Sequence, residues 1–543
     1  MLQKHRQRIC AVIISLVGAM LCLLPVLTQK GWPVNGEGLS FMTRTEMYAQ
    51  HFRHGDLFPI WSADTYGIGA PLPLYYQKSF YYVAAWLLMI FGSIKIALIL
   101  TLLGFMLAGM YGLRRCLQLL TKNPYLIALG PLLLVTNNYI SQLWYLKGAM
   151  AEFSAAMIVP WLVWWCLSLL KNRTFSWWIV PILFVLFNAH NAVFLFAPIP
   201  LIAAYGIYLY KEGHDAWLGS RIHLAISVIA LGVLLAPELL LQRYFLKYYN
   251  PARISEHGYR TSENFPNARH YLFSQGYGAW LLLSVLVLVA IILVVTRRKS
   301  LSGHWYRDSV PQFLAATLVG FVFLYLPLSR PLYTHVKLLE VIQFPTRLLA
   351  YILPLTLLVI IFLGEKIPNK RLAASAGALW LGVSLLFSPV FFTSRGSIPT
   401  KLFYYYQLDG FRSGHVWPKP ALAEYLPRVY DNGRELDSQQ LLSLYDALQR
   451  SDGSQPKLLT GGPCQTSWQR STTYEPQKMV FSITCSSSAS IALPISYNDF
   501  TDIRRSDGSE LVYTRTWPND PRIVIALPPG SERLKVTLPQ IFR

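Results

Sequence analysis

Long apolar stretches recur along most of this chain, and they constrain its fold more than any other feature. The chain has 543 residues, of which 53% are hydrophobic and only 14% are charged, a composition too apolar for an ordinary soluble protein. We therefore predict a polytopic α-helical membrane protein with about 11 transmembrane helices. The stretches that match a membrane crossing in length lie at 9–28, 94–113, 124–138, 149–170, 175–189, 192–210, 222–242, 276–296, 312–329, 348–364 and 372–393.

The basic residues are concentrated beside these stretches. The formal net charge is +21, and before Ser394 the chain carries 31 basic against 13 acidic residues. In a soluble chain this excess would suggest a nucleic-acid partner, but beside lipid it follows from the positive-inside rule, so we predict no nucleic acid. The rule places the N-terminus in the cytoplasm, and an odd number of crossings then places the C-terminal part in the periplasm. The predicted location is the bacterial inner (cytoplasmic) membrane.

The sequence divides into two predicted domains. Residues 1–393 form the transmembrane domain, with 29–93 as its first extracytoplasmic loop, in which the aromatic stretch 79–91 is expected to lie at the membrane interface as a helix. Residues 394–543 lose the apolar stretches and instead show short alternating runs between Asp-Gly and Pro-Gly turns, which predicts a β-rich periplasmic domain. Because that compartment is oxidising, its two cysteines, Cys464 and Cys485, are disulfide candidates.

Ionisable residues are nearly absent from the predicted spans, so each exception is a functional hypothesis. Glu152, Glu238 and His190 all lie toward the outer ends of spans, which predicts one polar site at the outer surface. Each also has a structural alternative: Glu152 could pair with Lys147, Glu238 could reach the interface by snorkelling, and His190 could bond at a helix turn. A transporter would more naturally place its polar groups near the midplane.

Several short motifs occur in the order known from one membrane-protein family. Residues 35–46 read Asn-Gly-Glu-Gly-Leu-Ser-Phe-Met-Thr-Arg-Thr-Glu, and later come 147–153, 189–191, 343–347 and 424–427. This pattern resembles the GT-C superfamily of polytopic glycosyltransferases, and specifically the bacterial membrane proteins labelled 6-pyruvoyl-tetrahydropterin-synthase-related. The later segments resemble, in order, that family's Arg-Gly-x-x-x-Glu, Ser-His-Asn, Phe-Pro-Trp-Arg and Glu-Tyr-Leu-Pro elements. One departure concerns the first loop, where relatives have Asp followed four residues later by His, and this chain has Glu37 and Phe41.

The resemblance implies a GT-C-like fold and a sugar transfer at the outer membrane face. The donor would be a polyprenyl-phosphate-linked sugar, and the partners would be a glycan or lipid-linked acceptor, membrane lipids and envelope-assembly proteins. Transfer needs a base for the acceptor hydroxyl and cations for the leaving phosphate. The carboxylates that could act as the base are Glu37, then Glu46, with Glu152 as a third catalytic candidate. The residues that could bind the lipid phosphate are Arg44, His190, Arg330, Lys337 and Arg347.

Two other functions remain compatible with the sequence. One is a transporter or flippase for a lipid-linked glycan, and the other is a non-catalytic scaffold of a polysaccharide assembly system, which the replacement of His by Phe41 leaves open. No spacing of cysteines or histidines predicts a metal site, and no nucleotide-binding motif is present. The sequence therefore requires no cofactor, and a divalent cation is left open.

Overall fold

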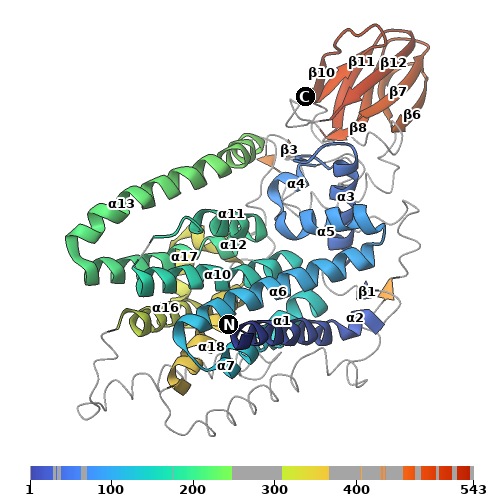
Figure 1. Ribbon diagram of the computed structural model, residues 1–543. Coiled ribbons are helices and arrows are strands. Elements are labelled where there is room, and N and C mark those ends of the chain that lie inside the picture. Colours follow the sequence, from blue (N-terminus) through green and yellow to red (C-terminus); the bar gives the residue numbers. More distant parts are fainter. Residues whose placement is uncertain are drawn as a thin grey trace.

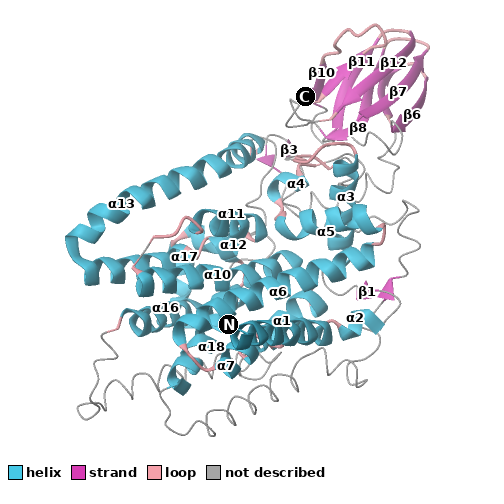
Figure 2. Ribbon diagram, in the orientation of Figure 1, coloured by secondary structure: helices cyan, strands magenta, loops and turns pink. Residues whose placement is uncertain are grey.

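The computed structural model describes most of the membrane domain and the core of the C-terminal part. The described residues are 2–28, 32–33, 38–62, 70–173, 175–246, 308–365, 405–406, 430–431, 434–435, 456–470, 478–496, 501–515 and 522–538. Within them the chain is mostly helical, and its strands gather in the C-terminal part (Figure 2). The predicted spans 276–296 and 372–393, and the boundary at 393, lie outside the described residues.

Apolar helices make up the N-terminal two thirds of the described structure (Figure 1). Their bounds are α1 Leu2–Cys22, α2 Leu24–Thr28, α3 Gly38–Arg53, α4 Leu72–Tyr75, α5 Ser79–Phe91, α6 Ile94–Leu120, α7 Pro124–Leu129, α8 Leu132–Val135, α9 Asn138–Ser141, η2 Gln142–Leu146, α10 Met150–Asn172, α11 Ile179–Ala189, α12 Asn191–Phe194, α13 Pro198–Phe245, α16 Ser309–Tyr325, η5 Pro327–Ser329, α17 Arg330–His335, η6 Lys337–Ile342, η7 Pro345–Leu348 and α18 Leu349–Glu365.

Five helical segments in the described residues are long and apolar enough to cross a membrane, or up to seven if two bent pairs each count as one span. The protein is thus a multi-pass membrane protein, but the predicted total of about 11 spans is not confirmed. The predicted straight spans 124–138 and 312–329 are both broken, with bends of 44° and 77° between their helical halves. Pro327 explains the second break, because it cannot continue the hydrogen-bond ladder of the preceding helix. The first break lies at Thr136-Asn137, where the Asn137 side chain accepts a hydrogen bond from the Tyr139 backbone N–H and begins a new helix.

Two further predicted spans also differ from expectation. Residues 175–189 supply only the short helix α11, of 11 residues. The predicted spans 192–210 and 222–242 are joined by helix rather than by an irregular loop, since α13 runs through the connection, and Figure 1 shows α13 bending near its middle. The connection contains no proline, so nothing in its sequence stops the helix. The aromatic stretch 79–91 does form a helix, α5.

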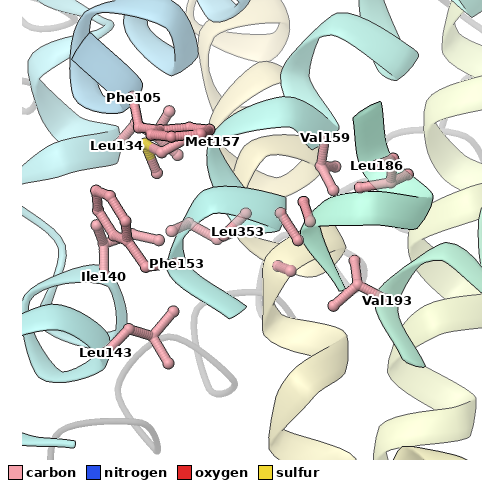
Figure 3. Packing of buried hydrophobic residues seen from close by; sticks show 14 of the residues in the cluster. Phe105, Leu134, Ile140, Leu143, Phe153, Met157, Val159, Leu186, Val193 and Leu353 are labelled. Atoms are coloured by element: carbon pink, nitrogen blue, oxygen red, sulfur yellow. The ribbon is translucent and has the colours of Figure 1, made fainter. Parts of the chain in front are cut away.

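Helix α10 is the centre of the buried core. Figure 3 shows apolar side chains of the neighbouring helices gathered around Phe153, Met157 and Val159 of α10. Two glycines let α6 approach it closely: a Cβ atom at Gly109 would lie 2.7 Å from the Met157 sulfur, and one at Gly112 would lie 2.9 Å from Trp161. Small residues at such seams allow close van der Waals packing, which drives helix association in lipid.

The C-terminal strands form two four-stranded antiparallel sheets, in the orders β10-β11-β8-β5 and β6-β7-β12-β9. Alternate residues of the inner strands are buried in one shared core, as expected for strands with one solvated face. Cys464 and Cys485 face each other across β6 and β7 and form a disulfide. The strand bounds are β5 Lys457–Gly461, β6 Cys464–Arg470, β7 Lys478–Cys485, β8 Ala489–Ser496, β9 Asp502–Arg504, β10 Tyr513–Arg515, β11 Arg522–Leu527 and β12 Gly530–Thr537.

This β-sandwich shares its apolar core with the first loop. Ile60, Trp61 and Leu74 of the loop and Phe245 at the end of α13 belong to the same buried cluster as the sandwich residues. Figure 1 shows the sandwich beside α3 and α4. In addition, the short strand β1 (Trp32–Pro33) pairs with β2 (Tyr405–Tyr406). The loop and the C-terminal part therefore lie on the same side of the membrane. The remaining short strands, β3 (Tyr430–Asp431) and β4 (Arg434–Glu435), pair with each other.

Candidate active site

Glu152 is buried in the first turn of α10, where the helix N-terminus favours a negative charge. Both of its carboxylate oxygens are engaged. The Tyr139 hydroxyl donates a hydrogen bond to Oε1 at 2.8 Å, and Arg347 Nε donates to Oε2 at 3.3 Å. The ion pair joins residues far apart in sequence, and both side chains are largely buried. Glu152 therefore holds the Arg347 guanidinium in place. The sequence alone also allowed Glu152 to pair with Lys147, an arrangement that would not fix Arg347.

Arg347 is aimed by a sharp turn in the chain before it. Gln343 adopts a left-handed φ of 62° between η6 and η7, a conformation that costs energy for a residue with a side chain. The turn brings the Ile342 carbonyl to Arg347, whose Nη1 donates to it at 2.9 Å. The guanidinium also lies 5.5 Å from the Phe344 ring centroid. Within the described chain, Nη2 of Arg347 makes no hydrogen bond, so this edge of the fork can take an anionic ligand.

His190 lies at the break between α11 and α12 and faces the same site. Its Nδ1 accepts a hydrogen bond from the Val193 backbone N–H at 3.3 Å, which caps α12. Burial and the nearby Arg347 charge hold the pKa of His190 well below 6.5. A neutral imidazole that accepts at Nδ1 carries its proton on Nε2. His190 thus offers an uncharged N–H donor beside the Arg347 guanidinium.

Among the described side chains, the charges around Arg347 sum to a positive site. Lys147 is half-buried just before α10. Burial and the Arg347 charge lower its pKa, while the Glu152 charge opposes the shift. Two cations, Lys147 and Arg347, therefore face one carboxylate, that of Glu152, with the neutral His190 beside them. We name these four residues together with Tyr139 the Arg347 cluster. Its excess of positive charge and its directed N–H groups suit a phosphate oxygen.

A second polar cluster joins the first loop to α13. Lys78 Nζ lies 2.7 Å from Glu238 Oε2, and Gln242 Nε2 donates to Glu238 Oε1 at 3.1 Å. Gln242 also donates to the Leu74 carbonyl at 2.8 Å, which fixes α4 against α13. Burial lowers the pKa of Lys78 while the Glu238 charge opposes that shift. Glu238 is therefore an ion-pair partner rather than a snorkelling side chain.

The two clusters lie close together. The Lys78 backbone N–H donates to the Asn188 carbonyl at 2.7 Å, and Asn188 is only two residues before His190, a chain distance of at most about 7 Å. The two clusters therefore lie on either side of the α11–α12 break. This arrangement brings Glu152, Glu238 and His190 to one end of the helix bundle.

The predicted loop residues Arg44 and Glu46 on α3 have partners outside the Arg347 cluster. Arg44 is buried, with its guanidinium carbon 3.6 Å from the Tyr76 ring centroid and Nη1 3.5 Å from the Tyr81 hydroxyl. Glu46 points to the opposite side of α3 and pairs with Arg53 at 3.1 Å near the surface. A spacing of two residues on a helix separates side chains by about 200°, so Arg44 and Glu46 cannot serve one small site together.

The other predicted residues are placed as follows. Glu37 and the segment 424–427 lie outside the described residues. Arg330 begins α17 and is exposed, and Lys337 begins η6. Phe41, which stands where relatives have His, is fully buried and contacts the Trp32 ring edge-on at a centroid distance of 5.9 Å. Among the described residues, no group of three His, Cys, Asp or Glu side chains comes together as metal ligands.

Three residues of these clusters escaped sequence reasoning. Tyr139 follows a polar break, Asn137-Asn138, inside a predicted span, and Gln242 follows Glu238 by one helical turn. Both spacings are signals that could have been used. Lys78 directly precedes the aromatic stretch 79–91, which gives no indication of a partner 160 positions later in the sequence. Its role becomes visible only in the folded chain.

Comparisons with known proteins give only weak structural similarity. No family model matches the chain, and no curated protein matches it. Its structure is similar to the crystal structure of the apo form of the oligosaccharyltransferase of Archaeoglobus fulgidus, with a TM-score of 0.38 and 13% sequence identity. The match covers 71% of this chain and 54% of the other, so the chain spans about half the length of that protein. The proposed chemistry of this chain therefore rests on its own residues.

Proposed function

We propose that this protein is a membrane glycosyltransferase that moves a sugar from a polyprenyl-phosphate donor to an envelope glycan or lipid-linked acceptor. The reaction is proposed to take place on the periplasmic face of a bacterial inner membrane. The resemblance of its motifs to the GT-C superfamily supports this proposal. The observation that carries it is the Arg347 cluster, a positive site with an open guanidinium edge at one end of a helix bundle.

The Arg347 cluster is proposed to bind the phosphate of the donor. In a largely water-excluded site, fixed N–H donors stabilise developing charge without having to reorganise. Arg347 is fixed by Glu152 and by the Ile342 carbonyl. The neutral His190 adds a donor at Nε2, so charge and hydrogen bonds converge on the same ligand.

The transfer step balances as follows. The acceptor hydroxyl oxygen bonds to the anomeric carbon, while the bond from that carbon to the phosphate oxygen breaks. The electron pair of that bond leaves with the polyprenyl phosphate, whose charge Arg347 stabilises. The hydroxyl proton passes to a carboxylate, for which Glu37 is the first choice by its position in the first-loop motif. Glu152 is assigned to positioning Arg347, because both of its oxygens are occupied.

Three buried hydroxyls inside the described spans support an enzyme rather than a transporter. Thr101, Ser154 and Thr317 are buried within spans, and each hydroxyl donates to a carbonyl of its own helix. Such hydroxyls are satisfied locally and do not line a polar path. The charged Glu152 and Glu238 lie within three turns of a helix end. A transport pathway would instead need polar groups near the midplane.

Sugar transfer by the purified protein in nanodiscs tests this proposal. The assay supplies a panel of polyprenyl-phosphate sugars and an envelope-glycan extract. Arg347→Met is expected to reduce the transfer rate by about 10²–10³-fold, the loss seen when one stabilising donor is removed. Glu37→Gln is expected to abolish transfer at an unchanged melting temperature. The matched control is Arg505→Met, which removes a sandwich arginine that also pairs with a carboxylate, that of Glu532.

The outcomes separate the proposed enzyme from its rivals. Transfer by the wild type that disappears only in the site variants supports the enzyme. Donor movement across the bilayer without any transfer would identify a flippase. If the protein neither transfers sugar nor moves any donor across the bilayer, and envelope proteins bind to the sandwich, the protein is a scaffold. That outcome would contradict the proposal.

A further inference from the structure

The Lys78–Glu238 cluster has a different chemical character from the Arg347 cluster. Its two charges cancel within one ion pair of 2.7 Å, and both side chains keep a small exposed fraction, 15% and 18%. A neighbouring carboxylate, Asp56, is likewise bonded to a basic partner, His51, at 2.9 Å. Paired charges give little net field, so this region does not select a phosphate. Glu238 holds Lys78 and Gln242 in place, and the further N–H groups of the Lys78 ammonium and the side-chain oxygen of Gln242 can exchange hydrogen bonds with hydroxyls.

Two tyrosines lie near these carboxylates. Burial raises the pKa of Tyr82 well above the usual range, and the nearby charges of Glu238 and Asp56 raise it further. The pKa of Tyr48 is raised by burial and by neighbours that include Glu238. Both phenols therefore stay protonated. The Tyr48 hydroxyl already donates to the Pro73 carbonyl at 3.4 Å, so the Tyr82 hydroxyl is the one that can donate to a ligand. The region combines donors and acceptors of the kind that a sugar ring presents in return.

Aromatic rings connect this polar region to the surface. Tyr48 and Phe52 each lie 5.1 Å from Tyr82 between ring centroids, and Phe52 lies 5.3 Å from Trp86. Trp86 ends the column and is 45% exposed. Large amphipathic rings beside a few directed polar groups are the composition of small-molecule sites.

We propose that this region, the first-loop cluster of Lys78, Glu238, Gln242, Tyr82 and Trp86, binds the hydroxyl groups of an uncharged glycan acceptor. The inference rests on the proposed function and names the site of its second substrate. The donor phosphate goes to the positive Arg347 cluster, and the neutral glycan goes to the charge-paired first-loop cluster. The hydrogen bond between Lys78 and Asn188 keeps the two sites adjacent.

Binding of soluble oligosaccharides, released from an envelope-glycan extract, tests the inference. Saturation-transfer NMR on the full-length protein in nanodiscs, without donor, measures their dissociation constant. The double variant Lys78→Met/Glu238→Met removes both charges at once, which avoids leaving one buried and unpaired. It is expected to raise the dissociation constant about tenfold, the value of one hydrogen bond to a charged group. Trp86→Leu is expected to do the same.

The controls distinguish a binding site from a structural lock. Trp177→Leu changes an equally exposed tryptophan, at 46%, on another helix end and is expected to have no effect. Affinity for polyprenyl phosphate is expected to stay unchanged in every variant. Unchanged oligosaccharide binding in the double variant with a lowered melting temperature would show a lock, and no binding by the wild type would likewise overturn the inference. Binding without transfer would instead contradict the proposed function alone.

Discussion

At the scale of single residues, the ion pair between Glu152 and Arg347 decides the shape of the site. A buried pair is poor evidence for stability by itself, because desolvation offsets much of the attraction. Its value here is geometric. It fixes a guanidinium that the Gln343 turn has already brought to the end of α10.

Removal of one partner of the Glu152–Arg347 pair is expected to lower the free energy of unfolding far more than removal of both. Glu152→Ala leaves Arg347 buried without its carboxylate and is expected to lower the free energy of unfolding by about 3–5 kcal/mol. Glu152→Met/Arg347→Met restores an apolar contact and should recover most of that loss, although not the transfer activity. Thermal unfolding in detergent measures both. Equal destabilisation by the single and double variants would show that the pair does not act as a unit.

His190 makes the stability depend on pH. Its pKa in the folded chain lies well below the value of 6.5 expected when unfolded, so below about pH 6.5 only the unfolded chain takes up this proton. Stability is therefore expected to fall with decreasing pH, by up to about 1.4 kcal/mol per pH unit from this residue. His190→Asn keeps an oxygen to cap Val193 and should flatten the profile between about pH 7 and pH 5. Parallel melting curves for the two proteins check this.

At the scale of the elements, the contact between α6 and α10 positions Glu152. The helices meet at Gly109 and Gly112, where Met157 and Trp161 occupy the space of a side chain. The cluster at the end of α10 therefore depends on a seam buried inside the bundle.

Gly109→Ala is expected to destabilise the protein by about 1–3 kcal/mol, the usual cost of overpacking. A Cβ atom there would lie 3.1 Å from the Met157 backbone, which cannot rotate away. Gly104→Ala is the matched control on the same helix, since a Cβ there meets nothing within 4 Å, and it should be neutral or stabilising. Differential scanning fluorimetry of both variants gives the comparison. Similar melting temperatures would show that the seam tolerates a wider spacing.

Local sequence patterns predicted where helices form better than they predicted where helices break or continue. The apolar runs at 94–113 and 149–170 became α6 and α10, and 79–91 became the helix α5. The bend at Pro327 was foreseeable from proline alone, whereas the helical link through 211–221 was not. Glu152, His190 and Arg347 do lie together, but the partners of Arg44 and Lys78 could not be read, because such contacts join distant segments and leave no periodic signal.

At the scale of the whole molecule, the β-sandwich and the first loop act as one body on one side of the membrane. Their apolar residues belong to a single buried cluster. The orientation predicted from the basic loops then places both in the periplasm, opposite the short loop after α6.

Cysteine labelling in intact cells tests this orientation. Val512→Cys, at an 84% exposed position in the sandwich, is expected to react with a membrane-impermeant maleimide. Lys122→Cys, exposed in the loop between α6 and α7, is expected to react only after the cells are permeabilised. Cys10, the exposed native cysteine among the described residues, is first replaced by Ser. The reverse labelling pattern would invert the predicted topology.

The shared cluster of loop and sandwich also has a consequence for biosynthesis. Trp61 is made long before the sandwich residues of its cluster. Phe481, for example, follows 420 residues later, roughly 20 to 80 s at bacterial elongation rates of about 5–20 residues per second. During that interval the loop must shelter its apolar side chains without the sandwich. A premature stop codon near the end of the reading frame would remove part of the sandwich. It would therefore damage the first loop and the first-loop cluster, although the residues of both had already been translated.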